Sequence, residues 1–402
     1  MISTEFAVNE EKDDAYLSLK LLFQPWRWKK GRNLNKAKNY IRSKFFDDSF
    51  QVFFFLTGRS ALFHLFKNLK LEKGSEILIQ GFTCEAVVLP ILVNDLKPVY
   101  VDIEEKTLSM NIIDLKKKIT NKSKILILQH TFGITPLYRK EILSLAKEKG
   151  VIIIEDLAHG FDSSLEINNT ALLSFGRSKA LSSVFGGAIV TKDKLLSKNL
   201  EQSQETFSFP DNGFMIKLLI YKPLGWIIKV TYDFYIGKFI HFLARKTNLL
   251  VPEITTKEKA GNFEPMLDKA YPNALSILLN NQLKKFDQMQ KKRTSSSTIY
   301  EQLLEKTINH KPKNTGGMLR YPLLVKNRDY IVKKFTQKNI FIGKWYDQVV
   351  APRELDLKRV GYIQGSCPIA EDICQKIINL PTNISEEEAK RVVSTLNDVI
   401  KI

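Results

Sequence analysis

Lys179 and Asp156 stand in settings where a side chain can take part in a reaction. Lys179 lies in the Ser- and Gly-rich stretch SFGRSKALSSVFGGAIVT. A lysine enclosed by apolar or cationic groups has a lowered pKa and can form a Schiff base with an aldehyde, whereas an open loop lysine is a solvated surface charge. Asp156 ends the run VIIIED, and ligands bind at the carboxyl ends of strands in open α/β sheets. The alternative for Asp156 is an ordinary turn residue.

A third candidate segment is LTGRSALFHLF, which places Gly58, Arg59 and Ser60 where a strand-like run turns into a helix. The first backbone N–H groups of a helix have no partner within the helix, and together with the helix dipole they bind phosphate. This segment is therefore a candidate phosphate site. The alternative is an ordinary helix cap at Ser60.

Histidines and cysteines offer no metal site in this sequence. The five histidines show no metal-ligand spacing, and Cys84, Cys367 and Cys374 form no CxxC pair. Neither a disulfide framework nor a structural zinc site is expected, and a reducing cytosol is the simplest compartment. The N-terminal MISTEFAVNEEKDD is acidic and polar, whereas a signal peptide is basic and then apolar, so we expect a cytoplasmic protein.

The elements that must position these candidates form an alternating pattern. Short apolar runs alternate with amphipathic segments of about a dozen residues, which predicts stacked βα units around a mostly parallel sheet. The apolar runs cover residues 76–80, 98–103, 124–129, 151–156, 171–175 and 187–191. Further on, residues 273–306 are expected to form one long helix.

Charge and composition restrict the class of protein. The 402 residues include 44% hydrophobic and 26% charged residues, which excludes a disordered chain. The 61 Lys and Arg against 43 Asp and Glu give a net charge of +18, which suits nucleic acid, anionic membrane or phosphorylated ligands. No helix-turn-helix, zinc or RNA-binding signature accompanies this charge, so we expect no nucleic-acid partner.

Residues 214–250 combine aromatic and basic residues. They hold six Lys or Arg and one acidic residue, a mixture typical of a segment at a membrane interface. No window of 18 residues is free of charge, so the segment is not expected to span a membrane. We expect peripheral contact with anionic lipid. The alternative is a helical subdomain packed on the protein's own dimer, because the charges form no single helical stripe.

The joint order of these motifs resembles the DegT/DnrJ/EryC1/StrS sugar aminotransferase family, whose members use pyridoxal phosphate. The resemblance is closest over about residues 50–200 and looser over 270–402. It is carried by TGRSAL, GFTCEAVV, VYVDI, HTFG, IIEDLAHG, SFGRSKAL with GGAIV, and CPIAEDICQKIINLP. The resemblance implies an α/β aspartate aminotransferase-like large domain (fold type I) with a mostly parallel sheet, and a smaller α+β C-terminal domain.

The resemblance also assigns roles around the cofactor ring. Lys179 would bind pyridoxal phosphate covalently and then move a proton as the catalytic acid and base. Asp156 would pair with the pyridine nitrogen, and His159 matches the family's Gln or His that contacts the ring.

Other positions match the family's cofactor phosphate site or depart from the family. Gly58, Arg59, Ser60 and Ser174 fall where the family binds the phosphate. Cys84 stands where many members carry the aromatic residue that stacks on the ring, so stacking could come from Phe82 or be replaced by a thiol contact. The family's phosphate-binding Asn from the partner subunit lies in a stretch displaced here by an insertion, and Asn273 is the candidate for that role.

By this resemblance the protein is a cytoplasmic, homodimeric transaminase. It would move an amino group from an amino acid, commonly glutamate in the family, to a keto-sugar, nucleotide-linked or lipid-linked, in surface polysaccharide or glycoconjugate synthesis. One alternative is a pyridoxal-phosphate sugar dehydratase, but those relatives replace the lysine by His, so Lys179 argues against it. Another is a non-catalytic membrane-associated regulator with the same fold, which intact Asp156 and Lys179 disfavour.

We expect five regions along the chain, in keeping with a length that favours two domains. The regions are a basic aromatic N-terminal arm over 1–50, a cofactor-binding large domain over 51–204, a basic aromatic insertion over 205–265, a connecting helix over 266–314 and a small C-terminal domain over 315–402.

Overall fold

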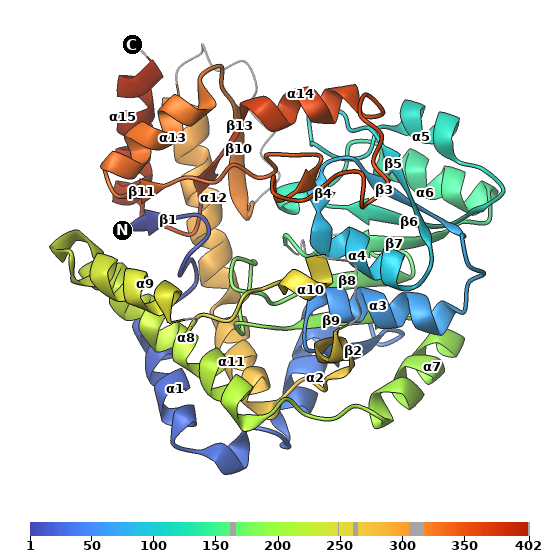
Figure 1. The fold of residues 1–402 in the computed structure, drawn as a ribbon, viewed down its shortest axis with the longest axis horizontal. Coiled ribbons are helices and arrows are strands. Elements are labelled where there is room, and N and C mark those ends of the chain that lie inside the picture. The colour runs from blue at the N-terminus through green and yellow to red at the C-terminus, as the bar shows by residue number, and fades with distance from the viewer. Residues whose placement is uncertain (161–165, 248, 260–263, 305–316, 401–402) are drawn as a thin grey trace.

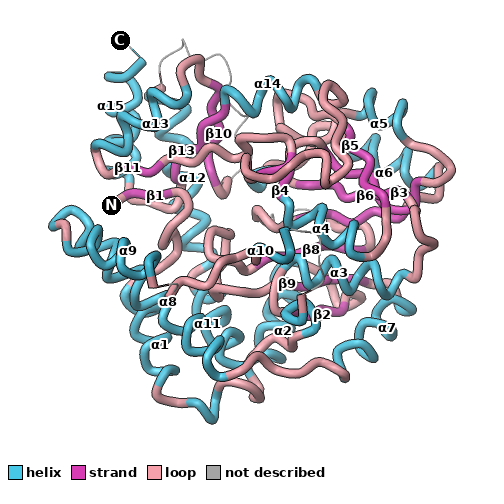
Figure 2. Tube along the Cα trace, in the orientation of Figure 1, coloured by secondary structure: helices cyan, strands magenta, loops and turns pink. Residues whose placement is uncertain are grey.

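The computed structural model describes residues 1–160, 166–247, 249–259, 264–304 and 317–400. In Figure 1 a large body contains the main sheet and its helices, and most of the C-terminal elements gather beside it at the upper left, whereas the C-terminal helix of residues 368–376 runs along the top of the molecule. The N-terminal residues lie against both parts. Figure 2 shows the strands of the main sheet side by side, with helices around them.

The main sheet has seven strands in the order β2-β9-β8-β7-β6-β3-β5. The strands are β2 (Gln51–Phe55), β3 (Glu76–Gln80), β5 (Lys97–Val101), β6 (Ser123–Gln129), β7 (Ile152–Asp156), β8 (Thr170–Ser174) and β9 (Gly187–Thr191). β9 is antiparallel to both of its neighbours, and the other pairs are parallel. This confirms the expected mostly parallel sheet, with strand bounds within two residues of the predicted runs.

Helices cover both faces of the sheet. Side chains alternate between the two faces along each strand, and because both sets are apolar, each face needs a layer of helices to bury it. On one face Ile77 and Ile79 pack with α3 (Gly58–Leu69) and α4 (Glu85–Val93). On the other face Leu78 packs with α5 (Ile112–Lys118) and α6 (Arg139–Glu148). The sheet is therefore the buried middle layer of three.

The N-terminal region is folded into the body of the protein. It contains β1 (Ile2–Ser3), α1 (Lys12–Leu22) and α2 (Asn33–Phe45). β1 pairs with β11 (Ile340–Phe341) of the C-terminal domain, whereas α2 packs on the second face of the main sheet with α11 (Asn273–Lys284). The first residues thus tie the two domains together.

The insertion after α7 (Lys194–Glu205) is helical. It contains α8 (Asn212–Thr231), α9 (Ile236–Lys246) and the short α10 (Thr256–Lys259). α8 packs along α1, and α9 lies at the left edge of the molecule in Figure 1. Among the described residues, no helix combines the length and the apolar character that a membrane crossing needs.

The expectation of a single helix over 273–306 is wrong. The chain forms α11 and then α12 (Phe286–Leu303), and the two helices meet at Lys285, which is the C-cap of one and the N-cap of the other. Residues 305–314, which the predicted connecting helix also covers, lie outside the described residues.

The small domain is built on β10 (Arg320–Leu324), which is antiparallel to β13 (Ile377–Pro381). Its helices are α13 (Arg328–Gln337), α14 (Pro368–Lys376) and α15 (Glu386–Ile400). A loop of this domain carries β12 (Val350–Ala351), which pairs with β4 (Thr83–Cys84) of the large domain. That pairing brings small-domain residues to the carboxyl ends of the sheet strands.

Candidate active site

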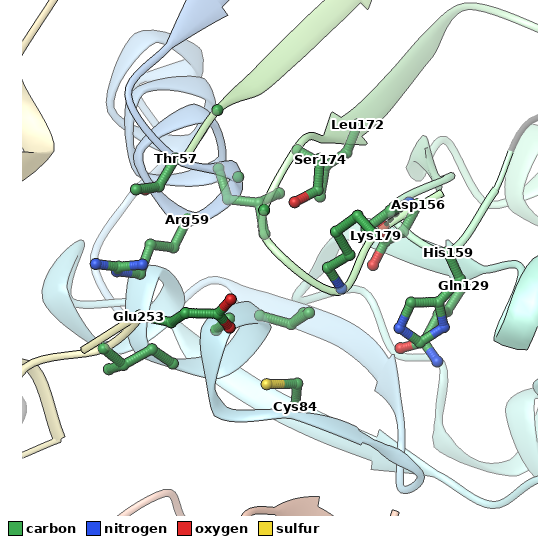
Figure 3. A pocket seen from close by; sticks show the side chains of 18 of the residues that line it. Thr57, Arg59, Cys84, Gln129, Asp156, His159, Leu172, Ser174, Lys179 and Glu253 are labelled. Atoms are coloured by element: carbon green, nitrogen blue, oxygen red, sulfur yellow. Dashed lines mark hydrogen bonds between the residues drawn. The ribbon is translucent and has the colours of Figure 1, made fainter. Parts of the chain in front are cut away.

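Lys179 lies in the loop between β8 and β9 and lines a cleft at the carboxyl ends of the parallel strands. Figure 3 shows its side chain directed into this cleft, between Ser174 and Asp156. Burial lowers the pKa of the Lys179 amine, although Cys84, Asp156 and Glu253 oppose the shift. A larger fraction of the amine is therefore neutral and nucleophilic at a given pH than for an exposed lysine.

Asp156 is the last residue of β7 and is 3% exposed. One carboxylate oxygen, Oδ1, accepts a hydrogen bond from the backbone N–H of Ala158 at 2.9 Å. Among the described residues Oδ2 has no hydrogen-bond partner. Burial raises the pKa of this carboxyl above its usual range. A cation bound beside Asp156 in the cleft would lower this pKa again and so stabilise the ionised carboxylate.

Glu155, the neighbour of Asp156, forms a buried ion pair that stabilises the fold. Its carboxylate binds Arg139 through two hydrogen bonds of 2.7 and 2.8 Å and lies 3.0 Å from Nε2 of His130. Burial alone would raise the pKa of Glu155, but these partners outweigh it and lower the pKa to about 2. The two adjacent acids therefore have separate tasks.

His159 stands in the cleft as a neutral ring. Its Nδ1 accepts the backbone N–H of Phe132 at 3.1 Å, which leaves the proton of the neutral imidazole on Nε2. Nε2 lies 3.2 Å from the hydroxyl of Tyr346, to which it can donate. Burial holds the pKa of His159 well below its usual range, and Lys179 and Arg320 add to this effect. The ring orientation is thus fixed from both nitrogens.

The start of α3 forms the other end of the cleft. Thr57 is the N-cap and accepts the backbone N–H of Ser60, so the alternative of a cap at Ser60 is wrong. The hydroxyl of Ser60 bonds to that of Thr57 at 2.8 Å, and Ser60 does not line the cleft. Gly58 and Ser174 do line it, and a Cβ at Gly58 would lie 3.2 Å from Oγ of Ser174.

Arg59 also lines the cleft, but its charge is already matched within the chain. The Glu258 carboxylate in α10 binds Nε and Nη2 of Arg59, the latter at 3.0 Å, and both side chains are buried. Figure 3 shows the guanidinium directed away from Ser174. Arg59 is expected from the sequence to add positive charge for a phosphate, whereas in this structure Glu258 neutralises that charge.

Cys84 lines the cleft at the end of β4, and burial raises the pKa of its thiol, so the thiol stays protonated. The alternative stacking residue, Phe82, is fully buried and packs edge-on against Tyr346 at 5.1 Å rather than lining the cleft. Asn273 bonds through its amide nitrogen to the Arg27 carbonyl at 2.7 Å and through its oxygen to Asn33 at 3.0 Å. Its side chain therefore holds the N-terminal region.

Four residues of the site were missed from the sequence. Glu253 of the insertion and Trp345 and Tyr346 of the small domain line the cleft. Lys179 Nζ lies 5.9 Å from the centre of the Trp345 ring, and Arg320 stacks on the same ring at 3.8 Å. Arg320 is 1% exposed, and its three side-chain nitrogens have no hydrogen-bond partner among the described residues. Its nearest acid, Glu5, lies 3.9 Å away.

A model of the DegT/DnrJ/EryC1/StrS aminotransferase family matches residues 51–210 and 272–397 of the chain, which leaves out most of the insertion. GDP-perosamine synthase of Escherichia coli O157:H7 is 31% identical over 145 residues, which cover 35% of this chain and 40% of that protein. UDP-N-acetyl-3-dehydro-alpha-D-glucosamine 3-aminotransferase of Acidithiobacillus ferrooxidans is 30% identical over 153 residues, covering 36% of this chain and 41% of that protein. Each match thus spans about two fifths of the relative.

A solved structure, Helicobacter pylori PseC, an aminotransferase involved in the biosynthesis of pseudoaminic acid, has a TM-score of 0.73 to this chain. The superposition covers 99% of each chain at 16% sequence identity. The likeness extends over both domains and shows that the two proteins share a fold.

Proposed function

Because the chain belongs to the DegT/DnrJ/EryC1/StrS aminotransferase family, we propose that it transfers an amino group from an amino acid to a keto-sugar with the help of pyridoxal phosphate. The observation that carries this proposal is the buried amine of Lys179, with its lowered pKa, in one cleft with the buried carboxyl of Asp156. The names of two relatives, a GDP-perosamine synthase and a UDP-sugar aminotransferase, favour a nucleotide-linked sugar as the acceptor. Glutamate is the proposed donor.

The residues present fit this cofactor. At the start of α3, the backbone N–H groups of Gly58 and Arg59 and the hydroxyl of Ser174 have no hydrogen-bond partner among the described residues. Unpaired N–H groups at a helix N-terminus suit a phosphate monoester. At the other end of the cleft, Oδ2 of Asp156 can pair with a protonated ring nitrogen. When bound, pyridoxal phosphate supplies an aldehyde carbon for covalent attachment and a ring that accepts electrons from the substrate.

The chain's own groups have distinct tasks in this proposal. Nζ of Lys179 acts first as a nucleophile and then carries a proton to and from the substrate carbon. Asp156 supplies a negative charge beside the ring nitrogen. Burial favours the protonated carboxyl, but a cationic partner would lower its pKa and keep it ionised. His159 stays neutral because of its burial, and Tyr346 and Phe132 hold its ring in one orientation.

The guanidinium of Arg320 supports an amino acid as the donor. A buried, incompletely paired cation destabilises a fold unless an anion completes it, and guanidinium groups bind carboxylates through two parallel hydrogen bonds. Arg320 stacks on Trp345, which lines the cleft. We infer that the carboxylate of the donor binds here when it enters the cleft.

The proposal is tested with the full-length protein and pyridoxal phosphate. The expected result is a visible absorbance band from cofactor covalently attached to Lys179, absent in Lys179→Ala and present in the control Lys192→Ala, whose side chain lies over Phe50 instead. Mass spectrometry of products from a panel of keto-sugar nucleotides with glutamate should then detect an amino sugar. An unchanged band, or unchanged product formation, in Lys179→Ala would contradict the proposal.

We also propose that α9 contacts the cytoplasmic face of an anionic membrane. Large apolar side chains are exposed on α9 and just before it, namely Phe234, Tyr235, Ile236, Phe239, Phe242 and Leu243. Basic residues flank this apolar surface, at Lys238, Arg245 and Lys246. Because apolar insertion and attraction to anionic lipid act together, this arrangement fits a helix lying in the membrane interface.

The membrane proposal is tested by flotation with vesicles of phosphatidylcholine and phosphatidylserine. The double variant Phe239→Ser, Phe242→Ser should float much less than wild type, whereas Leu195→Ser, an equally exposed apolar residue on α7, should float normally. Equal flotation of the double variant would contradict the proposal. If the double variant instead changes from dimer to monomer in light scattering, the surface is a contact between two copies of the chain.

A further inference from the structure

The backbone at Lys179 is held by side chains from outside its loop. Nδ2 of Asn9 donates a hydrogen bond to the carbonyl oxygen of Lys179 at 2.6 Å. Nη2 of Arg293, in α12, donates to the carbonyl oxygen of Ala180 at 2.8 Å. Two successive carbonyls, the first belonging to the reactive lysine, therefore have side-chain partners from remote parts of the chain.

Asn9 is itself fixed on several sides. Its Oδ1 accepts from Nη2 of Arg293 at 3.3 Å and from Nδ2 of Asn383 at 3.1 Å, and its backbone carbonyl accepts from Nε2 of Gln282 at 3.2 Å. Asn9 is 2% exposed, so these bonds form away from water. Buried amides are strongly oriented, because an unmet hydrogen bond there costs about 1–3 kcal/mol.

The segment that carries Asn9 is anchored on both sides of it. Before Asn9, β1 pairs with β11 of the small domain. After Asn9, the carboxylate of Glu10 pairs with Lys222 of α8 at 3.4 Å, and both side chains are fully buried. The segment between these anchors therefore has little freedom to move, and Asn9 meets Lys179 in a fixed position.

The loop around Lys179 needs such support because it lies between two strands and forms neither helix nor strand itself. Within the loop the Lys179 N–H bonds to the Gly176 carbonyl at 3.2 Å. The direction of a long side chain depends on its backbone, and a displacement of about 1 Å at a reacting group can reduce a rate about 100-fold.

We propose that Asn9 is a positioning residue for Lys179, which holds the peptide of the reactive lysine so that its amine points into the cleft. Asn9 does not line the cleft, so it acts through the backbone of Lys179 and, by way of Arg293, of Ala180. The inference rests on the proposed role of Lys179 as the reactive amine. It gives the N-terminal segment a part in the reaction and not only in the stability of the fold.

Two variants separate positioning from stability. Asn9→Leu has similar size and removes every side-chain hydrogen bond. Asn9→Asp keeps the shape and the acceptors for Arg293 and Asn383, gains an ion pair with Arg293, and places an oxygen against the Lys179 carbonyl. Asn33→Asp is the matched control, because Asn33 also belongs to the N-terminal region but bonds to Asn273.

The first readout does not depend on catalysis. Formaldehyde and cyanoborohydride methylate lysine amines, and peptide mass spectrometry follows Lys179 in the full-length protein as a function of pH. If Asn9 positions the amine, both variants should release it toward solvent and raise its pKa, so the pH at which Lys179 methylation is half-maximal should move upward relative to wild type. Because Asn9→Leu adds no charge, its upward shift separates positioning from the electrostatic effect of a new carboxylate.

The second readout is the turnover of amino transfer together with the melting temperature. We expect kcat to fall about 10- to 100-fold in both variants. Asn9→Asp should melt somewhat lower than wild type, because its new oxygen faces the buried Lys179 carbonyl without a hydrogen bond, so kcat is compared at a temperature where the variants are folded. Asn33→Asp, at a half-buried site, should keep kcat. Unchanged Lys179 methylation in folded Asn9→Leu, or in Asn9→Asp if the first variant fails to fold, overturns the inference. If methylation responds but the wild-type protein forms no amino sugar from any acceptor, the proposed function fails while the positioning contact stands.

Discussion

The carboxylate of Glu258 binds the guanidinium of Arg59 at two points, so that a residue of the insertion is paired with the first turn of α3. Glu258 also accepts the backbone N–H of Thr255 at 2.8 Å, at the start of its own helix. The insertion is thereby attached beside the unpaired N–H groups proposed to bind phosphate. Arg59 can contribute charge to a bound phosphate only if it is shared with, or released from, Glu258.

Replacement of Glu258 by Gln should therefore make stability depend on phosphate. Loss of one member of a buried ion pair commonly costs about 3–5 kcal/mol, because the other charge remains buried without a partner. We expect a lower melting temperature in phosphate-free buffer and a partial recovery with inorganic phosphate, measured by scanning fluorimetry. The exposed Glu387→Gln is the control. A phosphate response equal to that of wild type would argue against a shared site.

Glu155 should contribute stability that is lost in acid. Its pKa is lowered from 4.5 to about 2 in the folded protein, so its contribution is present above pH 4.5 and is lost as the pH falls toward 2. The contribution amounts to about 3 kcal/mol at neutral pH. In Arg139→Met the carboxylate loses two hydrogen bonds, so the midpoint of acid unfolding, followed by circular dichroism, should move to higher pH. An unchanged midpoint would show that the ion pair between Glu155 and Arg139 does not contribute to the resistance of the fold to acid.

A methyl group at Gly187 should displace the start of α3 and so disturb the proposed phosphate site. A Cβ at Gly187 would lie 2.5 Å from the backbone nitrogen and Cα of Gly58, so the start of α3 would have to move. We expect Gly187→Ala to lose about 1–3 kcal/mol of stability, as for other overpacked sites, and to bind pyridoxal phosphate at least several-fold more weakly. Gly225→Ala, whose Cβ would meet Ala7 at an ordinary 3.4 Å, is the control. Equal cofactor affinity in the two variants would contradict this prediction.

Arg320→Met should reduce kcat/KM for the proposed donor glutamate without lowering the stability of the fold. Removal of a buried, incompletely paired cation is expected to leave the melting temperature unchanged or to raise it. Loss of a charged hydrogen-bond partner for the donor carboxylate, worth about 1.5–3 kcal/mol, should reduce kcat/KM for glutamate by roughly 10- to 100-fold. Steady-state kinetics with varied glutamate and a fixed sugar acceptor measure this change. A lower melting temperature with unchanged glutamate kinetics would assign Arg320 a structural task.

The sheet and the residues on its strand ends could be predicted from the sequence because the signal is local. Buried parallel strands are continuous apolar runs, and Asp156 follows directly on one of them. Lys179 stands between two such runs, so its loop had to reach the same edge of the sheet. The helix start at residue 58 was also predictable, but Thr57 and Ser60 are both able to cap, and only the helix bounds decide between them.

The other side of the cleft could not be predicted, because packing between distant segments forms it. Trp345 reaches the site through the pairing of β12 with β4, a contact of two residues per strand. Glu253 enters from an insertion that the family model does not match. The short stretch around Asn9 has no periodic pattern, and its importance depends on a hydrogen bond to a residue 170 positions away.

The polar network around Asn9 sets a condition on the biosynthesis of this protein. Asn9 bonds to Lys179, to Arg293 and to Asn383, so the network joins residues up to 374 positions apart. A ribosome releases the chain from its N-terminus, and Asn9 emerges long before its last partner. Contacts of such large sequence separation form slowly. An incomplete chain that already contains Lys179 therefore lacks part of the support for its backbone, and the network is complete only after Asn383 has been synthesised.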